Sequence, residues 1–324
     1  RKAAHANSWY SGDARTLDKE LTTWLSRVQQ SSIVEDSEPY APPIKGCKAI
    51  IAPHAGYSYS GPAAAWAYKS IDVTGIKRVF ILGPSHHIYL DGCALPICTE
   101  YATPVGSLPL DLDTIAELKA TGEFSEMGKR VDEDEHSIEM HLPYVRKVFE
   151  KQDIKMVPIL VGSISKDKEA QFGKLLAPFL SRDDTFCVVS SDFCHWGTRF
   201  SYTFYYPSEL PASGVRLSRR GPNPDTLTTF PIHKSISTLD HEAMSILTIP
   251  GPDPSRSVHD EFANYLARTK NTICGRHPIG VLLGVLESLE KRPATLRWVR
   301  YEQSNECEDV NDSSVSYASA YVVF

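Results

Sequence analysis

The chain has 324 residues, of which 42% are hydrophobic and 23% charged, which is typical of a globular protein with one large or two small α/β domains. Its formal net charge of −6 argues against a nucleic-acid-binding surface. No apolar run approaches the roughly 20 residues that span a bilayer, so membrane insertion is not expected. Residues 1–10 lack an apolar core and do not predict a secretory signal.

The chain contains seven cysteines, and no two of them are spaced as C-x-x-C. An odd number without this spacing predicts neither a disulfide framework nor a structural zinc site. Reduced cysteines favour a reducing compartment, so we expect a cytoplasmic protein, with the nucleus as a second location.

The predicted elements begin with an amphipathic helix over residues 16–30, where apolar side chains recur at helical spacing, followed by a Pro-rich connection. Short β-branched segments that end in Gly, Pro, Ser or Asp predict buried strands at 48–53, 78–84, 155–162 and 186–192. Helical patterns follow the first and third of these strands, at 62–71 and 166–180. Two C-terminal segments, 295–304 and 314–324, are predicted to add antiparallel strands to the same sheet.

Strands that alternate with helices predict an α/β fold, with a mostly parallel central sheet flanked by helices. We find no internal repeat and no domain boundary, and therefore predict a single domain over residues 1–324. Residues 207–231 contain five prolines and no apolar periodicity, which predicts a mobile insertion. Arg216, Arg219 and Arg220 make this segment basic, but a solvated loop is a simpler interpretation than a binding arm.

Side chains suited to chemistry follow three of the predicted strands. His54 follows the first strand, His86 and His87 follow the second, and Asp192 and His195 follow the fourth. In open parallel sheets, ligands bind beyond the carboxyl ends of the strands. Each histidine alone is best explained by a structural role, but together they predict a site. Of the adjacent pair we favour His86, which is closer to the strand end.

Cys274 is a further candidate. We expect Pro278 to be the first residue of an apolar helix that runs to about residue 289. Cys274 would then lie just before a helix N-terminus, near Arg276 and His277, where positive charge favours the thiolate. On this segment alone, an inert buried cysteine is the simpler interpretation. Two imidazoles and one thiolate would suit Fe(II), copper or zinc.

Residues 131–145 form a dense polar cluster. The acidic residues 132–135 predict a helix N-terminus. His136 and His141 are five residues apart and do not share a helix face, which argues against a two-histidine metal site. A His136 that donates or accepts a proton beside a pocket, and a capped surface helix with incidental histidines, explain this segment equally well.

Six long motifs resemble those of the Memo family: APHAGYSYSG, ILGPSHH, DEDEHSIEMHLPY, VVSSDFCHWG, NTICGRHPIGVLL and DSSVSYA. The resemblance extends from residue 5 to residue 318, with residues 207–231 looking like an insertion. It implies a fold similar to that of the class III extradiol dioxygenases, non-haem iron enzymes whose Fe(II) is held by two His and one Glu.

The resemblance also implies roles for individual residues. The metal ligands would be His54, His86 and Cys274, with the cysteine in place of the glutamate. His195 and Asp192 would line the pocket as acid–base or supporting groups. His136 would also take an acid–base role there. The residues themselves, rather than the resemblance, suggest a pocket wall of Tyr57, Tyr59, Trp196 and Arg276, and a structural role explains each of them equally well.

The function implied by the resemblance is that of a redox-linked protein that binds iron or copper, with zinc as an adventitious occupant. Its expected roles are in cell motility, receptor tyrosine kinase signalling and metal homeostasis. An alternative is a non-enzymatic adaptor that binds phosphotyrosine peptides or signalling adaptors through the pocket. A third is a dioxygenase acting on a catechol-like substrate, which is disfavoured because Cys274 replaces the carboxylate ligand.

Overall fold

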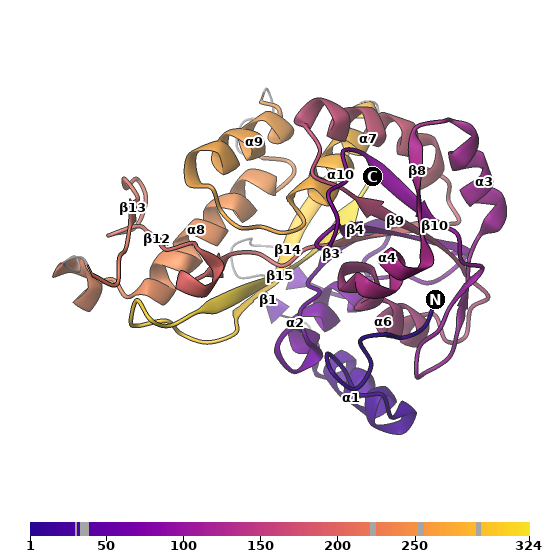
Figure 1. Ribbon diagram of the computed structural model, residues 1–324, viewed down its shortest axis with the longest axis horizontal. Coiled ribbons are helices and arrows are strands. Elements are labelled where there is room, and N and C mark those ends of the chain that lie inside the picture. Colours follow the sequence, from indigo (N-terminus) through magenta and orange to yellow (C-terminus); the bar gives the residue numbers. More distant parts are fainter. Residues whose placement is uncertain (30, 33–38, 221–224, 252–255, 290–292) are drawn as a thin grey trace.

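A mixed sheet runs through the centre of the computed structural model, which describes residues 1–29, 31–32, 39–220, 225–251, 256–289 and 293–324 (Figure 1). Within these residues the strand order is β11 (His195–Trp196), β15 (Ser314–Val323), β3 (Cys47–Ala52), β10 (Thr185–Ser190), β4 (Arg78–Pro84), β9 (Lys155–Val161), β5 (Cys93–Pro96) and β8 (Phe124–Met127), and β14 (Thr295–Gln303) pairs with β15. The remaining strands are short pairs: β1 (Ser31–Ser32) with β2 (Pro39–Tyr40), β6 (Glu100–Tyr101) with β7 (Leu108–Pro109), and β12 (Phe204–Tyr205) with β13 (Val215–Arg216).

The four central strands, β3, β10, β4 and β9, are parallel, whereas β15 and β14 join one side of the sheet in antiparallel orientation. Nearly every residue of the central strands is buried. Burial on both faces explains why these strands are continuous apolar runs rather than alternating ones. The predicted α/β class, the four buried strands and the two antiparallel additions are therefore confirmed.

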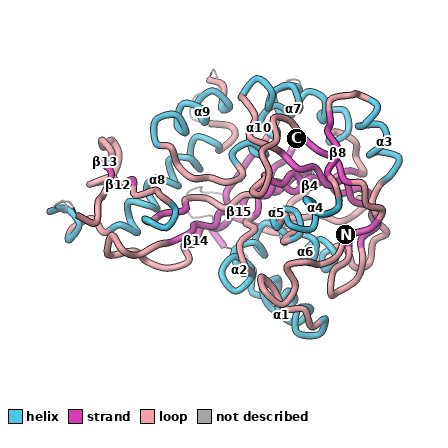
Figure 2. Tube along the Cα trace, in the orientation of Figure 1, coloured by secondary structure: helices cyan, strands magenta, loops and turns pink. Residues whose placement is uncertain are grey.

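Helices cover both faces of the sheet. On one face lie α1 (Ala14–Arg27), α2 (Tyr57–Lys69) and α6 (Leu142–Val148), and on the other lie α7 (Lys166–Leu180) and α10 (Arg276–Ser288) with α9 (Val258–Thr269) beside them (Figures 1 and 2). The other helices are α3 (Leu112–Ala120), α4 (Lys129–Asp134), α5 (His136–Glu139), α8 (Ile232–Leu247) and the 3-10 turns η1 (Thr198–Phe200) and η2 (Asp225–Thr228). None of the described helices has the combined length and apolarity needed to cross a membrane.

Several helix boundaries differ from the predicted ones. α1 starts at Ala14 because the Asp13 carboxylate accepts a hydrogen bond from the backbone N–H of Thr16 at 2.8 Å. α2 starts five residues before the predicted first residue and carries Pro62 inside it. α10 starts at Arg276 rather than at Pro278. α7 has the predicted bounds, whereas α8 and α9 were not predicted.

Part of the predicted insertion has local structure. Its strand β13 pairs with β12, and Leu217 beyond it is buried. Residues 221–224 of the insertion lie outside the described residues. The mobility of residues 207–231 stays a prediction.

Asp240 on α8 holds together segments that are far apart in the sequence. Its carboxyl group accepts hydrogen bonds from the hydroxyl of Tyr301 on β14 at 2.9 Å and from the amide of Asn271 at 3.1 Å. It also accepts one from the backbone N–H of Cys194 at 3.3 Å. Burial raises the pKa of Asp240 to about 6, and these hydrogen bonds only partly offset that effect. Asp240 therefore anchors the loop before Cys274 at the cost of burying a carboxyl group.

We predict that Asp240 makes the protein less stable as pH rises from about 4 to about 6. The unfolded carboxyl has a pKa of about 3.9, so over this range the folded state retains a proton that the unfolded state has lost. Between pH 4 and pH 6 the free energy of unfolding should fall by about 2 kcal/mol from this group. Urea denaturation between pH 4 and pH 6 measures this change. In Asp240→Asn the free energy of unfolding should fall less than in the wild type, by the contribution of this group.

The matched control is Asp72→Asn, at a carboxyl whose pKa is lowered by the backbone N–H of Thr74. This variant should keep the fall in stability between pH 4 and pH 6. An unchanged fall in Asp240→Asn would contradict the prediction.

Candidate metal centre

The site lies where three neighbouring parallel strands end. β3 and β10 pair Ala52 with Ser190, so His54 and Asp192, each two residues farther on, emerge side by side. The backbone N–H of His54 donates to Oδ1 of Asp192 at 2.8 Å. His86 emerges two residues beyond β4, on the other side of β10. The sheet therefore brings the three candidate segments to one edge, as expected for a ligand site in an open α/β sheet.

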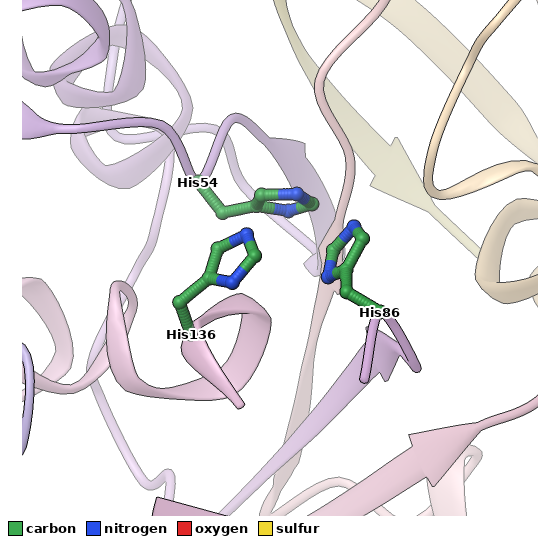
Figure 3. A group of neighbouring side chains, drawn as sticks. All are labelled: His54, His86 and His136. Carbon is green, nitrogen blue, oxygen red and sulfur yellow. The ribbon is translucent and has the colours of Figure 1, made fainter. Parts of the chain in front are cut away.

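Three histidine side chains face one another at this edge (Figure 3). His54, His86 and His136 each offer a ring nitrogen, and these nitrogens lie within 4.8 Å of one another. A second set within the same limit consists of His54, Asp192 and Cys274. His54 belongs to both sets, whereas His86 and Cys274, the other two predicted ligands, fall in different ones.

His54 is held with one particular nitrogen facing the site. Its Nδ1 is 2.6 Å from Oγ of Ser190, and that hydroxyl donates its hydrogen to the carbonyl of Ser137 at 2.7 Å. Ser190 must therefore accept a hydrogen bond from Nδ1–H of His54, which leaves the lone pair of the neutral ring on Nε2. Burial lowers the pKa of His54 well below its ordinary value, and His86 and His136 lower it further. The ring is thus neutral, and the lone pair on Nε2 faces the site.

Glu135 orients His86. Its carboxylate accepts hydrogen bonds from Nδ1 of His86 at 2.9 Å and from the backbone N–H of the same residue at 2.7 Å. Burial alone would raise the pKa of Glu135, but the hydrogen bonds from His86 and the charges of His86 and His136 lower it to about 2. A carboxylate bound to the far nitrogen of a histidine is typical of metal-ligating imidazoles. In the sequence, the only feature that pointed to Glu135 was its place in an acidic run.

The acidic run as a whole does not form the predicted helix N-terminus. Residues 132–134 lie in the second half of α4, and only Glu135 caps a helix, by accepting a hydrogen bond from the backbone N–H of Ser137 at the start of α5. Asp132 is instead buried and bonded to Arg1 and Tyr101. The prediction failed because the run is divided between two short helices.

His136, the first residue of α5, lies between two rings. The His86 ring stacks on it with centroids 4.4 Å apart, and the Trp9 ring lies 4.4 Å away. Burial lowers the pKa of His136 to about 3, with a further contribution from His86. At neutral pH the ring is therefore neutral, so its lone pair can accept a proton or bind a metal, but the ring cannot act as a general acid. The more exposed His87 groups with Glu135 and His136.

Cys274 reaches the site from the loop before α10. Its Sγ lies 3.1 Å from Nε2 of His54 and accepts a hydrogen bond from the backbone N–H of Asp192 at 3.2 Å. This approach requires glycine at the next position, because a Cβ on Gly275 would lie 2.3 Å from the carbonyl oxygen of Ser190. The Cys-Gly pair therefore allows the loop to pack directly against the end of β10.

The expected thiolate character of Cys274 is not supported. Burial raises the pKa of the thiol well above its ordinary value, and the charge of Asp192 raises it further. The opposing effect of Arg276 is smaller than these two. Burial also raises the pKa of Asp192. The prediction was wrong because it considered the helix end and the nearby cation but not the loss of solvent.

Four of the candidate donors, His54, His86, His136 and Asp192, line a cavity of about 520 Å³, whereas Cys274 is not among its described lining residues. His195 and Tyr59 line it. Three of the residues expected in the pocket wall have other contacts. Tyr57 is buried and donates to the carbonyl of Met140 at 2.6 Å.

Trp196 is also buried, and it donates from its indole N–H to the carbonyl of Phe204 at 2.8 Å. Arg276 donates to the carbonyl of Ile273 at 3.4 Å. Neither is among the described residues that line the cavity. The cavity does include Trp9 and Arg199, which the motifs did not single out as site residues.

Comparisons with known proteins identify the family. The family model described as Memo-like protein matches residues 1–321. Protein MEMO1 of Xenopus laevis is 44% identical over 100% of this chain and 97% of its own length, and that of Homo sapiens is 43% identical over 98% and 96%. The memo-1 homolog of Caenorhabditis elegans is 38% identical over 98% of this chain and 81% of its own length.

A crystal structure of an uncharacterized protein from Escherichia coli K12 is 15% identical, with a TM-score of 0.49 over 85% of this chain and 99% of that chain. The full-length match to the family model and the identity to the animal proteins leave one conclusion: the chain belongs to the Memo-like family.

Proposed function

We propose that this protein binds a redox-active transition metal ion, iron or copper, at the cluster centred on His54. The observation that carries the proposal is the convergence of two donor sets on one side chain. His54 shares one set with His86 and His136 and the other with Asp192 and Cys274. Imidazole, thiol and carboxylate donors together suit Fe(II), copper and zinc, and not the hard cations that prefer oxygen alone.

The chemistry of these donors supports a bound cation. The imidazoles of His54 and His136 are neutral, and neutral imidazole is the form that ligates metals. His54 and His86 each have Nδ1 bonded, by Ser190 and by Glu135, so that Nε2 carries the lone pair, and Nε2 of His54 lies 3.1 Å from Sγ of Cys274. Such hydrogen bonds fix the tautomer and the orientation of a ligating histidine before the metal arrives.

The ligands we assign are His54, His86 and Cys274, with His136 and Asp192 as additional donors beside them. A bound iron or copper ion would supply electron transfer, and it would stabilise the thiolate of Cys274 against the burial that disfavours it. Ser190 and Glu135 orient the two histidine ligands. The resemblance to the Memo family extends the proposal to receptor tyrosine kinase signalling, cell motility and metal homeostasis.

We predict that loss of either His54 or Cys274 lowers the metal content. Anaerobically purified protein should contain close to one equivalent of iron or copper, and His54→Ala and Cys274→Ala should each reduce it at least tenfold. Elemental analysis by mass spectrometry measures the change.

The matched controls remove the same residue types elsewhere. Cys98→Ala removes a thiol outside both donor sets, and His233→Ala removes an imidazole whose Nδ1 contacts the carbonyl of Cys307. Both should retain the wild-type metal content. Equal metal content in all five proteins would show that the ligands have been assigned incorrectly.

A subtler prediction concerns Ser190. Ser190→Ala removes the acceptor of the His54 Nδ1–H bond but none of the proposed ligands, so the ring loses its preferred tautomer and orientation. We expect metal affinity to fall about 10- to 100-fold, measured by competition with a chelator of known affinity. Ser60→Ala, which removes a hydroxyl bonded to the carbonyl of Ala55, is the control and should have little effect. An unchanged affinity in Ser190→Ala would mean that the hydrogen bond does not orient a ligand.

A further inference from the structure

Arg199 gives the cavity a cation that the metal cluster does not use. It is the only Lys or Arg side chain among the described residues that line the cavity, and Asp192 is the only carboxylate there. No described carboxylate forms an ion pair with Arg199. A guanidinium without a carboxylate partner at a cavity wall can form a charged, two-point hydrogen bond with a planar anion.

Packing places Arg199 beside the histidines. The guanidinium carbon lies 4.6 Å from the centroid of the Phe200 ring, the next residue in η1. That ring in turn meets the His195 ring edge-on at 5.2 Å. Both Phe200 and His195 line the cavity. Arg199 is exposed, and its guanidinium packs on an aromatic ring that also contacts His195.

The other walls of the cavity are aromatic or carry hydrogen-bond donors. The aromatic side chains that line it are Trp9, Tyr59, Phe200 and Tyr317. Asn305 also lines it and accepts a hydrogen bond from Ser304 at its Oδ1, at 2.8 Å, which leaves the amide N–H groups to donate. The nearby Asp312 carboxylate is occupied within its own loop by the backbone N–H groups of Glu308 and Asp309.

We propose that the cavity binds a small aromatic carboxylate, with its carboxylate on Arg199 and its ring against the aromatic side chains. This inference names a ligand class for the cavity beside the proposed metal site. It depends on the proposed function only because both use the same cavity. A cavity of about 520 Å³ lies within the size range of small-molecule sites, and its lining combines aromatic side chains with polar groups. A single guanidinium matches the single charge of a carboxylate, whereas an aryl phosphate carries about −1.5 to −2 charges.

The test uses benzoate, the simplest member of this class, with isothermal titration calorimetry on the purified protein. Wild-type protein should bind benzoate, and Arg199→Gln should bind it at least tenfold more weakly. Arg199→Lys, which keeps the charge but not the planar fork, should recover part of the affinity. Arg216→Gln is the matched control, because Arg216 stacks on Tyr202 and does not line the cavity. It should bind benzoate as the wild type does.

Two further ligands separate charge from ring packing. Phenol has the ring without the carboxylate, so it should bind the wild type more weakly than benzoate does. Its affinity for Arg199→Gln should equal its affinity for the wild type. Phenyl phosphate should also bind more weakly than benzoate to the wild type.

The proposal is overturned by any of three results. These are absence of benzoate binding to the wild type, equal affinity in Arg199→Gln, and tighter binding of phenyl phosphate than of benzoate. Metal content is measured on the same samples. If Arg199→Gln has the wild-type metal content and an unchanged affinity for benzoate, only the proposed ligand class is rejected. If His54→Ala has the wild-type metal content, only the proposed metal site is rejected.

Discussion

The parallel pairing of β10 between β3 and β4 is the constraint on which the site depends. Pairing of Ala52 with Ser190 places His54 beside Asp192, and the pairing of β10 with β4 brings His86 to the same edge. A slip of one residue would reverse which face each side chain points to, so the site would be lost together with the core packing. Because these strands are buried on both faces, the register that buries their apolar side chains is also the one that assembles the histidines.

Around this edge, hydrogen bonds from buried polar groups fix which nitrogen of each histidine carries the lone pair. The Ser190 hydroxyl donates a hydrogen bond to the carbonyl of Ser137 and must therefore accept one from Nδ1–H of His54. The Glu135 carboxylate accepts hydrogen bonds from both the ring and the backbone N–H of His86. Ser190 and Glu135 are buried, and a buried polar group left unpaired is costly, so each such bond restricts the ring to one tautomer and one orientation. Burial also keeps the imidazoles of His54 and His136 neutral and Cys274 a thiol, a state that a bound cation would change.

The sequence predictions succeeded where a local pattern decides structure and failed where a distant contact does. The four buried strands and α7 were predicted because apolar runs and helical spacing are local properties. The early start of α2 was missed because Pro62 looked like a first helical residue, whereas the structure places it inside the helix. Tyr57 and Tyr59 stand two residues apart in one motif, yet Tyr57 is buried against the Tyr144 ring and Tyr59 is 60% exposed at the cavity. Nothing in the spacing of the two tyrosines distinguishes them.

By itself, the sequence determined the α/β class, the edge of the sheet where a site would lie, and the residue types delivered there. These follow from strands that end in histidine or aspartate, because parallel strands bring their carboxyl ends to one side. Only the tertiary structure decided which side chains meet. Cys274 and His54 are 220 residues apart in the chain and 3.1 Å apart in space, and Glu135 reaches His86 across 49 residues. Such contacts, and the burial that sets the charge of each group, depend on how the whole chain packs and not on any local pattern of residues.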